Sequence, residues 1–195
     1  MGLRDVLTGR HEVKGPAPDR LFAITTAYIS LQSEHQIDPA GSAAIVFQAL
    51  ATSEFEATLR DMEEVVKATG GDSGTSVATQ DDSYGYRWMV LRNPEGAASV
   101  EDLAVGINGV SGSIETAGHG ERLLCAVFAF ADAQKHRIYF IYNYKRGFWY
   151  PFVPDPAGEQ QRLTERELQL KAQMASELPI EPELERWFPL WGIPI

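Results

Sequence analysis

Residues 138–154 constrain the fold most, because they combine a run of aromatic and aliphatic residues with a tight turn. The segment reads IYFIYNYKRGFWYPFVP, and the residues at its centre, Lys145-Arg146-Gly147, have the composition of a turn. The segment therefore predicts a buried strand, a turn and a second, antiparallel strand at 148–153. Because Pro151 has no backbone N–H, this second strand is expected at the edge of a sheet.

Other segments extend this sheet and add helices. The apolar runs at 123–131 and 137–144 predict central strands that are covered on both faces. Further strands are expected at 43–49, 75–79 and 84–92, and in the last of these Tyr84, Tyr86, Trp88 and Val90 alternate onto one face. Helical spacing of apolar residues predicts helices at 19–35, 53–69, 99–114 and 164–176. This order predicts an α+β fold, a mainly antiparallel sheet with helices packed on it.

Polar and small residues refine these elements. Ser53 with Glu56, and Thr164 with Glu167, have the spacing of capping boxes at helix starts. Three glycines inside the helix at 99–114 indicate either close approach to the sheet or a broken helix, and we interpret them as packing; they are Gly106, Gly109 and Gly112. Asp81-Asp82 fits a turn better than a metal site.

The chain divides into three parts: an N-terminal segment and linker at 1–18, a single α+β domain at 19–178, and an aromatic, proline-rich tail at 179–195. Leu3, Val6 and Leu7 give the first part an apolar face. It suits a membrane-binding segment, a partner-docking peptide, or a turn of helix that is packed on its own domain or frayed. Disordered tails are poor in aromatic residues, so the rings of the tail are expected to be buried on the domain or on a partner.

Composition and motifs exclude several functions. A net charge of −10 argues against nucleic-acid binding, which needs a basic surface. Cys125 lies in the longest apolar run, and this run is too short to span a membrane. No signal peptide is evident either. We therefore expect a cytoplasmic protein. The histidines lack metal-ligand spacing and no catalytic motif appears; the histidines are His11, His35, His119 and His136. We therefore expect no enzyme activity, no cofactor and no metal.

The candidate site is a partner-binding surface on the aromatic turn and the tail. We predict that Lys145 or Arg146 lies over an aromatic ring or meets an acid of the tail, and that Trp187 or Trp191 seals part of the sheet. The alternative is a small-molecule or enzymatic pocket near Lys145 and Arg146. The full predicted set is Lys145, Arg146, Phe148, Trp149, Tyr150, Trp187, Phe188 and Trp191.

Residues 142–154 (YNYKRGFWYPFVP) and 178–192 (LPIEPELERWFPLWG) resemble the PspA-associated PspAB family, as do residues 1–3, 55–61 and 84–88. The resemblance implies a bacterial cytoplasmic protein linked with PspA, the coiled-coil, ESCRT-III-like protein of the phage-shock membrane-stress response. It supplies neither an activity nor catalytic residues. Our first hypothesis is a non-catalytic adaptor that binds a protein partner such as PspA and reaches the membrane through it, and a homodimer is left open. The element order also resembles type III secretion chaperones, which gives no function by itself.

Overall fold

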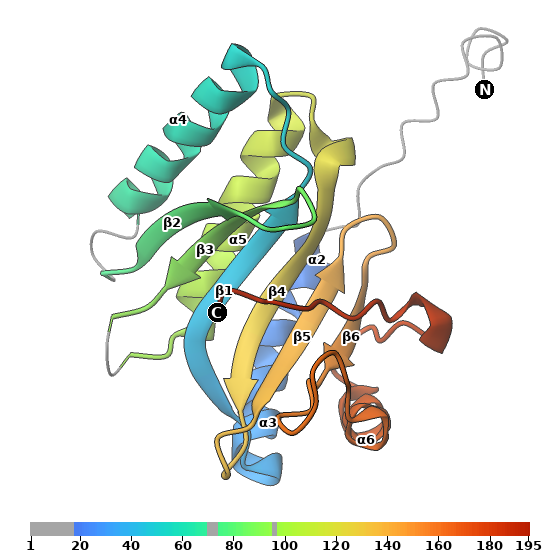
Figure 1. Ribbon diagram of the computed structural model, residues 1–195. Coiled ribbons are helices and arrows are strands. Elements are labelled where there is room, and N and C mark those ends of the chain that lie inside the picture. The colour runs from blue at the N-terminus through green and yellow to red at the C-terminus, as the bar shows by residue number, and fades with distance from the viewer. Residues whose placement is uncertain (1–17, 70–73, 95–96) are drawn as a thin grey trace, which may run out of the picture.

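The computed structural model describes residues 18–69, 74–94 and 97–195. These residues form a six-stranded antiparallel sheet in the order β2-β3-β1-β4-β5-β6, so the predicted α+β class is confirmed (Figure 1). The apolar face of Leu3, Val6 and Leu7 lies outside the described residues. The strands are β1 (Asp38–Phe47), β2 (Ser76–Asp81), β3 (Arg87–Arg92), β4 (Leu123–Ala131), β5 (Arg137–Asn143) and β6 (Phe148–Phe152).

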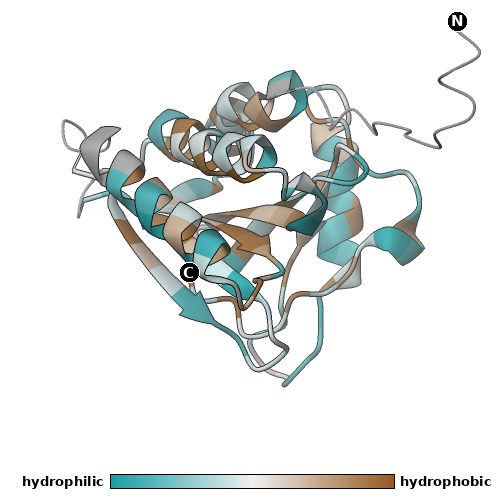
Figure 2. Ribbon diagram, turned by 90° about the horizontal axis from the view of Figure 1, so that it is seen from above, coloured by the Kyte–Doolittle hydropathy of each residue, from teal (hydrophilic) through white to brown (hydrophobic). Residues whose placement is uncertain are grey.

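The helices gather on one face of the sheet, and the C-terminal residues cross the other (Figures 1 and 2). One helix, α6, lies beside the edge strand β6. The predicted helix at 19–35 is interrupted at Ala23 and forms two helices, with Asp19 in the first turn of the short one. The helices are α2 (Pro18–Phe22), α3 (Ile24–His35), α4 (Ser53–Thr69), α5 (Val100–Thr116) and α6 (Thr164–Met174), with 3₁₀ turns η1 (Gly120–Arg122) and η2 (Leu184–Arg186).

Both faces of the sheet are apolar because both are covered. Along β4, Ala126 and Phe128 belong to the core beneath the helices, whereas Cys125 and Val127 belong to a second core on the opposite face. The neighbouring strands β1 and β5 alternate in the same way. This arrangement confirms that the run at 123–131 is a central strand buried on two sides.

The strand predicted at 84–92 begins only at Arg87, and this part of the prediction is wrong. The carboxylate of Asp82 accepts hydrogen bonds from the backbone N–H groups of Tyr84 and Tyr86, at 2.8 and 2.9 Å. These bonds close a turn, and both tyrosines are exposed. The Asp82 side chain therefore accepts backbone hydrogen bonds in place of the strand-to-strand bonds that the alternating pattern predicted. The interpretation of Asp82 as a turn residue is confirmed.

Neither predicted capping box forms. At α4 the hydroxyl of Thr52 accepts from the N–H of Phe55 at 3.3 Å, while Glu56 pairs with Arg87 at 2.7 Å. At α6 no side chain caps the first turn, and Glu167 is buried in an ion pair that is described below. In both helices the glutamate that was expected to reach back to the helix start binds an arginine, because a charged hydrogen bond is stronger than a neutral one.

The glycines of α5 leave the helix unbroken, and only one of them supports the packing interpretation. A Cβ atom on Gly106 would lie 2.3 Å from Cδ2 of Leu91 in β3. Side chains at Gly109 and Gly112 would meet nothing within 4 Å. Gly106 therefore lets the helix approach the sheet closely, whereas the other two glycines face outward.

Candidate functional site

Residues 179–195, which we call the strap, begin by extending the edge of the sheet. The N–H of Trp149 donates to the carbonyl of Pro179 at 2.9 Å, and the N–H of Glu181 donates to the carbonyl of Trp149 at 2.8 Å. These bonds form a parallel bridge between Trp149 and Ile180 beside β6. Because Pro151 has no backbone N–H, β6 lacks one hydrogen-bond donor at this edge of the sheet. The strap covers that edge.

A charged cluster holds the next residues of the strap. Arg146 forms a two-bond ion pair with Glu181, whose side chain is only 3% exposed, and contacts Glu183 at 3.2 Å. The same guanidinium lies 5.8 Å from the ring centre of Phe148, and Arg20 approaches that ring at 5.3 Å. The prediction that a basic residue of the turn meets an aromatic face or a tail acid is confirmed for Arg146 on both counts.

The electrostatics of this cluster stabilise its charged forms. The hydrogen bond with Glu181 raises the pKa of Arg146, and the hydrogen bond from Arg186 lowers the pKa of Glu183. Both groups therefore remain charged around neutral pH. Because Glu181 is buried, the cluster orders the strap by giving that carboxylate a fixed cationic partner.

Trp187 closes the second core. Its side chain is 4% exposed and stacks on Tyr150 with ring centres 6.2 Å apart. The indole N–H donates to the carbonyl of Glu181 at 3.0 Å, and the ammonium of Lys171 in α6 lies 5.7 Å from the ring centre. The prediction that a tryptophan of the tail seals part of the sheet is confirmed.

Arg162 links this region to α6. It pairs with Glu167, which is 1% exposed, and also donates to the carbonyl of Trp187 at 2.7 Å. Glu167 accepts a further hydrogen bond from the N–H of Val153 at 2.9 Å. Sequence analysis missed this pair, and the capping-box spacing suggested another role for the glutamate.

Beyond Trp187 the strap crosses the sheet and is held through backbone carbonyls. The hydroxyls of Tyr150 and Tyr139 donate to the carbonyls of Phe188 and Ile195, at 3.1 and 2.9 Å. Trp191 packs edge-on against Phe152, with ring centres 5.2 Å apart. The backbone is therefore fixed by side chains of the sheet, while strap side chains that point outward are unconstrained.

The structure divides the predicted partner-binding residues into three groups by exposure. Trp149, Tyr150 and Trp187 are buried in the cores, so a partner cannot reach their rings in this conformation. Phe188 is 58% exposed, and Lys145 is exposed without a side-chain partner among the described residues. Arg146, Phe148 and Trp191 are intermediate. Two exposed apolar residues were not predicted as binding residues: Leu184 in η2 and Leu168 in α6, which are 46% and 39% exposed.

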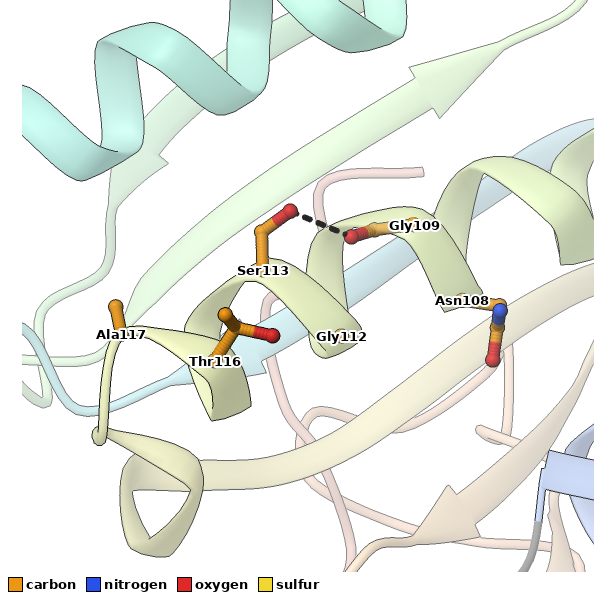
Figure 3. Close-up of a pocket in the computed structure, with 6 residues that line it drawn as sticks. All are labelled: Asn108, Gly109, Gly112, Ser113, Thr116 and Ala117. Carbon is orange, nitrogen blue, oxygen red and sulfur yellow. Dashed lines mark hydrogen bonds between the residues drawn. The ribbon is translucent and has the colours of Figure 1, made fainter.

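Three cavities among the described residues lie away from Lys145 and Arg146. A shallow hollow of about 560 Å³ follows the outer face of α5 around Gly109 and Gly112 (Figure 3). Its polar side chains diverge, and Ser113 already donates to the carbonyl of Gly109 at 2.9 Å. One further cavity lies between α4 and strands β2 and β3, and another lies between the end of the sheet and the last residues of the strap. Neither Lys145 nor Arg146 lines any of the three.

Burial keeps two titratable side chains of the core, Cys125 and Tyr142, in their neutral forms near neutral pH. Burial raises the pKa of the Cys125 thiol to about 12, so the group is protonated and a poor nucleophile near neutral pH. Burial likewise raises the pKa of Tyr142 to about 12. Among residues 18–69, 74–94 and 97–195, no cluster of histidine, cysteine and acidic side chains could hold a metal ion.

In the same three ranges, no helix is both long enough and apolar enough to cross a bilayer. No match was found among curated proteins or among solved structures. A family model does match, and its description is PspA associated protein B. Because the match extends over residues 1–195, the chain belongs to that family.

Proposed function

We propose that this protein is a non-catalytic adaptor that binds PspA in the phage-shock response to envelope stress. The family description supports an association with PspA. The observation that carries the proposal is the ring of Phe188, which is 58% exposed although the carbonyl of the same residue is held by Tyr150. An ordered backbone that presents an aromatic side chain to solvent is preorganised for binding, because little further entropy is lost on association.

The surroundings of Phe188 have the composition of an interface. Leu184 in η2 and Leu168 in α6 are also exposed, and Lys171 of α6 connects the two elements by donating to the carbonyl of Pro182, just before η2, at 3.4 Å. We call Leu168, Leu184 and Phe188 the strap patch. Protein interfaces commonly have such an apolar centre with charged residues at the rim.

Charges of both signs surround the strap patch. Arg186 pairs with Glu183 at 2.7 Å, and Lys171 lies over the ring of Trp187. Rim charges influence the choice of partner and the association rate more than the affinity. The binding energy is therefore expected to come from the apolar side chains, above all from Phe188.

The alternative, a small-molecule or enzymatic pocket near Lys145 and Arg146, has less support. Arg146 already binds two glutamates, and none of the three cavities is lined by either basic residue. A ligand would have to displace Glu181 from Arg146 and leave a buried carboxylate unpaired, which is costly. We therefore favour the adaptor.

Binding of purified full-length protein to purified PspA tests the proposal, with affinity measured by fluorescence anisotropy. Replacing Phe188 with alanine should weaken binding by roughly tenfold or more, the loss typical of an aromatic hot spot. Val105→Ala is the matched control, because Val105 is also 58% exposed but lies on α5, on the opposite side of the sheet. Melting temperatures of both variants should equal that of the unaltered protein.

Two results would contradict the proposal. The first is a wild-type protein that shows no affinity for PspA. The second is a loss of binding in the Val105 variant with none in the Phe188 variant, which would move the interface to the helical face.

A further inference from the structure

The sheet has one covered edge and one open edge. At β6 the strap forms a bridge through Ile180, and Pro151 has no backbone N–H to offer to a further strand. At the opposite end of the strand order lies β2, which pairs with β3 on one side and with no described strand on the other. The outer edge of β2 is therefore the place where another strand can join the sheet.

The hydrogen bonds of β3 identify the backbone groups of β2 that point outward. The N–H of Asn93, just beyond β3, donates to the carbonyl of Gly41 in β1 at 2.9 Å, so the odd-numbered residues of β3 face β1 and the even-numbered ones face β2. Even-numbered residues of β3 lie opposite even-numbered residues of β2. The odd-numbered residues of β2 therefore direct their N–H and carbonyl groups away from the sheet. These outward residues are Val77, Thr79 and Asp81.

The outward groups form an unpaired row. Among residues 18–69, 74–94 and 97–195, no backbone hydrogen bond joins them to another segment. The hydroxyl of Thr79 donates to Glu63 of α4, and Val77 packs against the core beneath the helices, so α4 covers a face of β2. The intervening residues Ala78 and Gln80 are exposed. A row of free N–H and carbonyl groups on an extended strand is suited to binding another extended chain.

β2 also lacks the features that usually keep exposed edges apart. Its sequence, SVATQD, contains no proline and no basic residue, and its pairing with β3 has no register shift. Its only charged residue, Asp81, lies at the end of the strand and pairs with Arg87 at 2.6 Å. An edge without such protection is expected to pair with an identical edge, because every other copy of the chain presents one.

We propose that β2 pairs with β2 of a second copy of this chain, antiparallel and about a two-fold axis at Thr79, so that the two sheets become one. In this register Thr79 lies opposite Thr79 of the second copy, and Val77 lies opposite Asp81 of the second copy. The residues of each pair exchange two backbone hydrogen bonds. Because the strap covers the β6 edge, the association ends at two copies and does not continue into a fibre.

The charges beside the edge are compatible with this pairing. The register keeps the two Asp81 side chains apart, because each lies opposite a valine. Arg60 of α4 lines the groove between α4 and β2 and has no partner among the described residues. This unpaired positive charge reduces the repulsion between two chains that each carry a net charge of −10. The pairing does not involve the strap patch, so the inference goes beyond the adaptor proposal and does not depend on it.

Hydrogen exchange of the isotope-labelled full-length protein tests the pairing at individual residues, with nuclear magnetic resonance at a series of protein concentrations. Exchange of the outward amides, at 77, 79 and 81, should slow by roughly tenfold or more as the concentration rises. The mass from sedimentation equilibrium should rise in parallel, towards twice that of one chain. The amides of Ala78 and Gln80 are the internal control, because they bind β3 at every concentration.

Two variants at the proposed axis provide a second test. Thr79→Pro removes the outward N–H at an edge position, where proline is tolerated. Each copy loses one hydrogen bond to the other, so the Kd of the dimer should rise by roughly tenfold or more. Thr79→Val is the matched control, because it removes the hydroxyl that binds Glu63 but keeps the N–H, and its Kd should change by less than about twofold. Circular dichroism verifies that both variants are folded.

Three results would overturn the proposal. The first is the mass of a single chain at every concentration. The second is a dimer whose outward amides exchange as fast as those of the monomer, and dissociation of that dimer by Phe188→Ala would place the contact at the strap patch. The third is protection of the outward amides only after PspA is added to a monomeric protein, which would assign the β2 edge to a strand of a different protein.

Discussion

Replacing Trp187 with alanine should destabilise the protein more than any other single truncation in the strap. The side chain is 4% exposed, stacks on Tyr150, and donates its indole N–H to the carbonyl of Glu181. Alanine would remove the ring from the second core and leave that buried carbonyl without this donor. Apolar burial and a hydrogen bond are therefore lost together.

The magnitude follows from the area that the ring covers. An aromatic ring of this size buries about 200–250 Å², which at ~25 cal/mol per Å² gives about 5–6 kcal/mol as an upper value. Truncations of buried aromatic residues typically cost ~3–5 kcal/mol. In a chain of 195 residues, each kcal/mol lowers the melting temperature by ~2–4 °C, so a decrease of ~6–20 °C is expected.

Two matched variants separate the contributions. Trp187→Phe keeps an aromatic ring over Tyr150 but removes the indole N–H, and should cost ~1–2 kcal/mol. Phe188→Ala changes the adjacent residue, which is 58% exposed, and should alter stability by no more than ~0.5 kcal/mol.

Urea denaturation followed by circular dichroism measures all three variants, since this signal does not depend on the tryptophan that is removed. Equal midpoints for the alanine variants at 187 and 188 would refute the reasoning, because the described burial requires them to differ. An unchanged midpoint for Trp187→Ala would mean that the strap does not contribute to the core.

Two other predictions test the helical face and the second core. Gly109→Ala should raise the free energy of unfolding by about 1 kcal/mol, because alanine has the higher helix propensity. Gly106→Ala should lower the free energy of unfolding, because the new Cβ atom would overlap Leu91. Thermal denaturation of the two variants compares these effects. Burial raises the pKa of Cys125 from 9.0 to about 12, so only the unfolded chain loses this proton between those values. The free energy of unfolding should therefore fall as pH rises above 9.0, by up to ~1.4 kcal/mol per pH unit from this group. Cys125→Ala should remove this contribution to the pH dependence, which urea denaturation at a series of increasing pH values measures.

The sequence predicted correctly those elements whose own pattern of apolar and polar residues determines which of their side chains are buried. The strand at 123–131 is observed with the predicted bounds, because its apolar run is buried on both faces and ends at Asp132. The start of β3 was predicted wrongly because Tyr84 and Tyr86 continue the alternation of a strand. The hydrogen bonds of Asp82 that end this pattern depend on a turn geometry that alternation does not describe.

The site was predictable in composition but not in orientation. The aromatic residues of the turn and the tail were expected to meet, and Arg146 was expected to find an aromatic or acidic partner, both of which the structure shows. Trp187 and Phe188 are adjacent and similar in hydrophobicity, yet one is buried and the other exposed. Their difference depends on the path of the strap over β6, which long-range hydrogen bonds determine.

The way the strap is attached would allow one segment to serve both stability and the partner recognition that we propose. Tyr150, Tyr139, Arg162 and Arg92 all hold it through backbone carbonyls, which every residue possesses. Substitution of an outward side chain therefore leaves these bonds intact and changes only what the surface offers to a partner. Phe188 shows this directly, because its carbonyl accepts from Tyr150 while its ring is exposed. Recognition by the strap can thus be altered without altering the fold, which is the condition that the Phe188 variant requires as a test of binding.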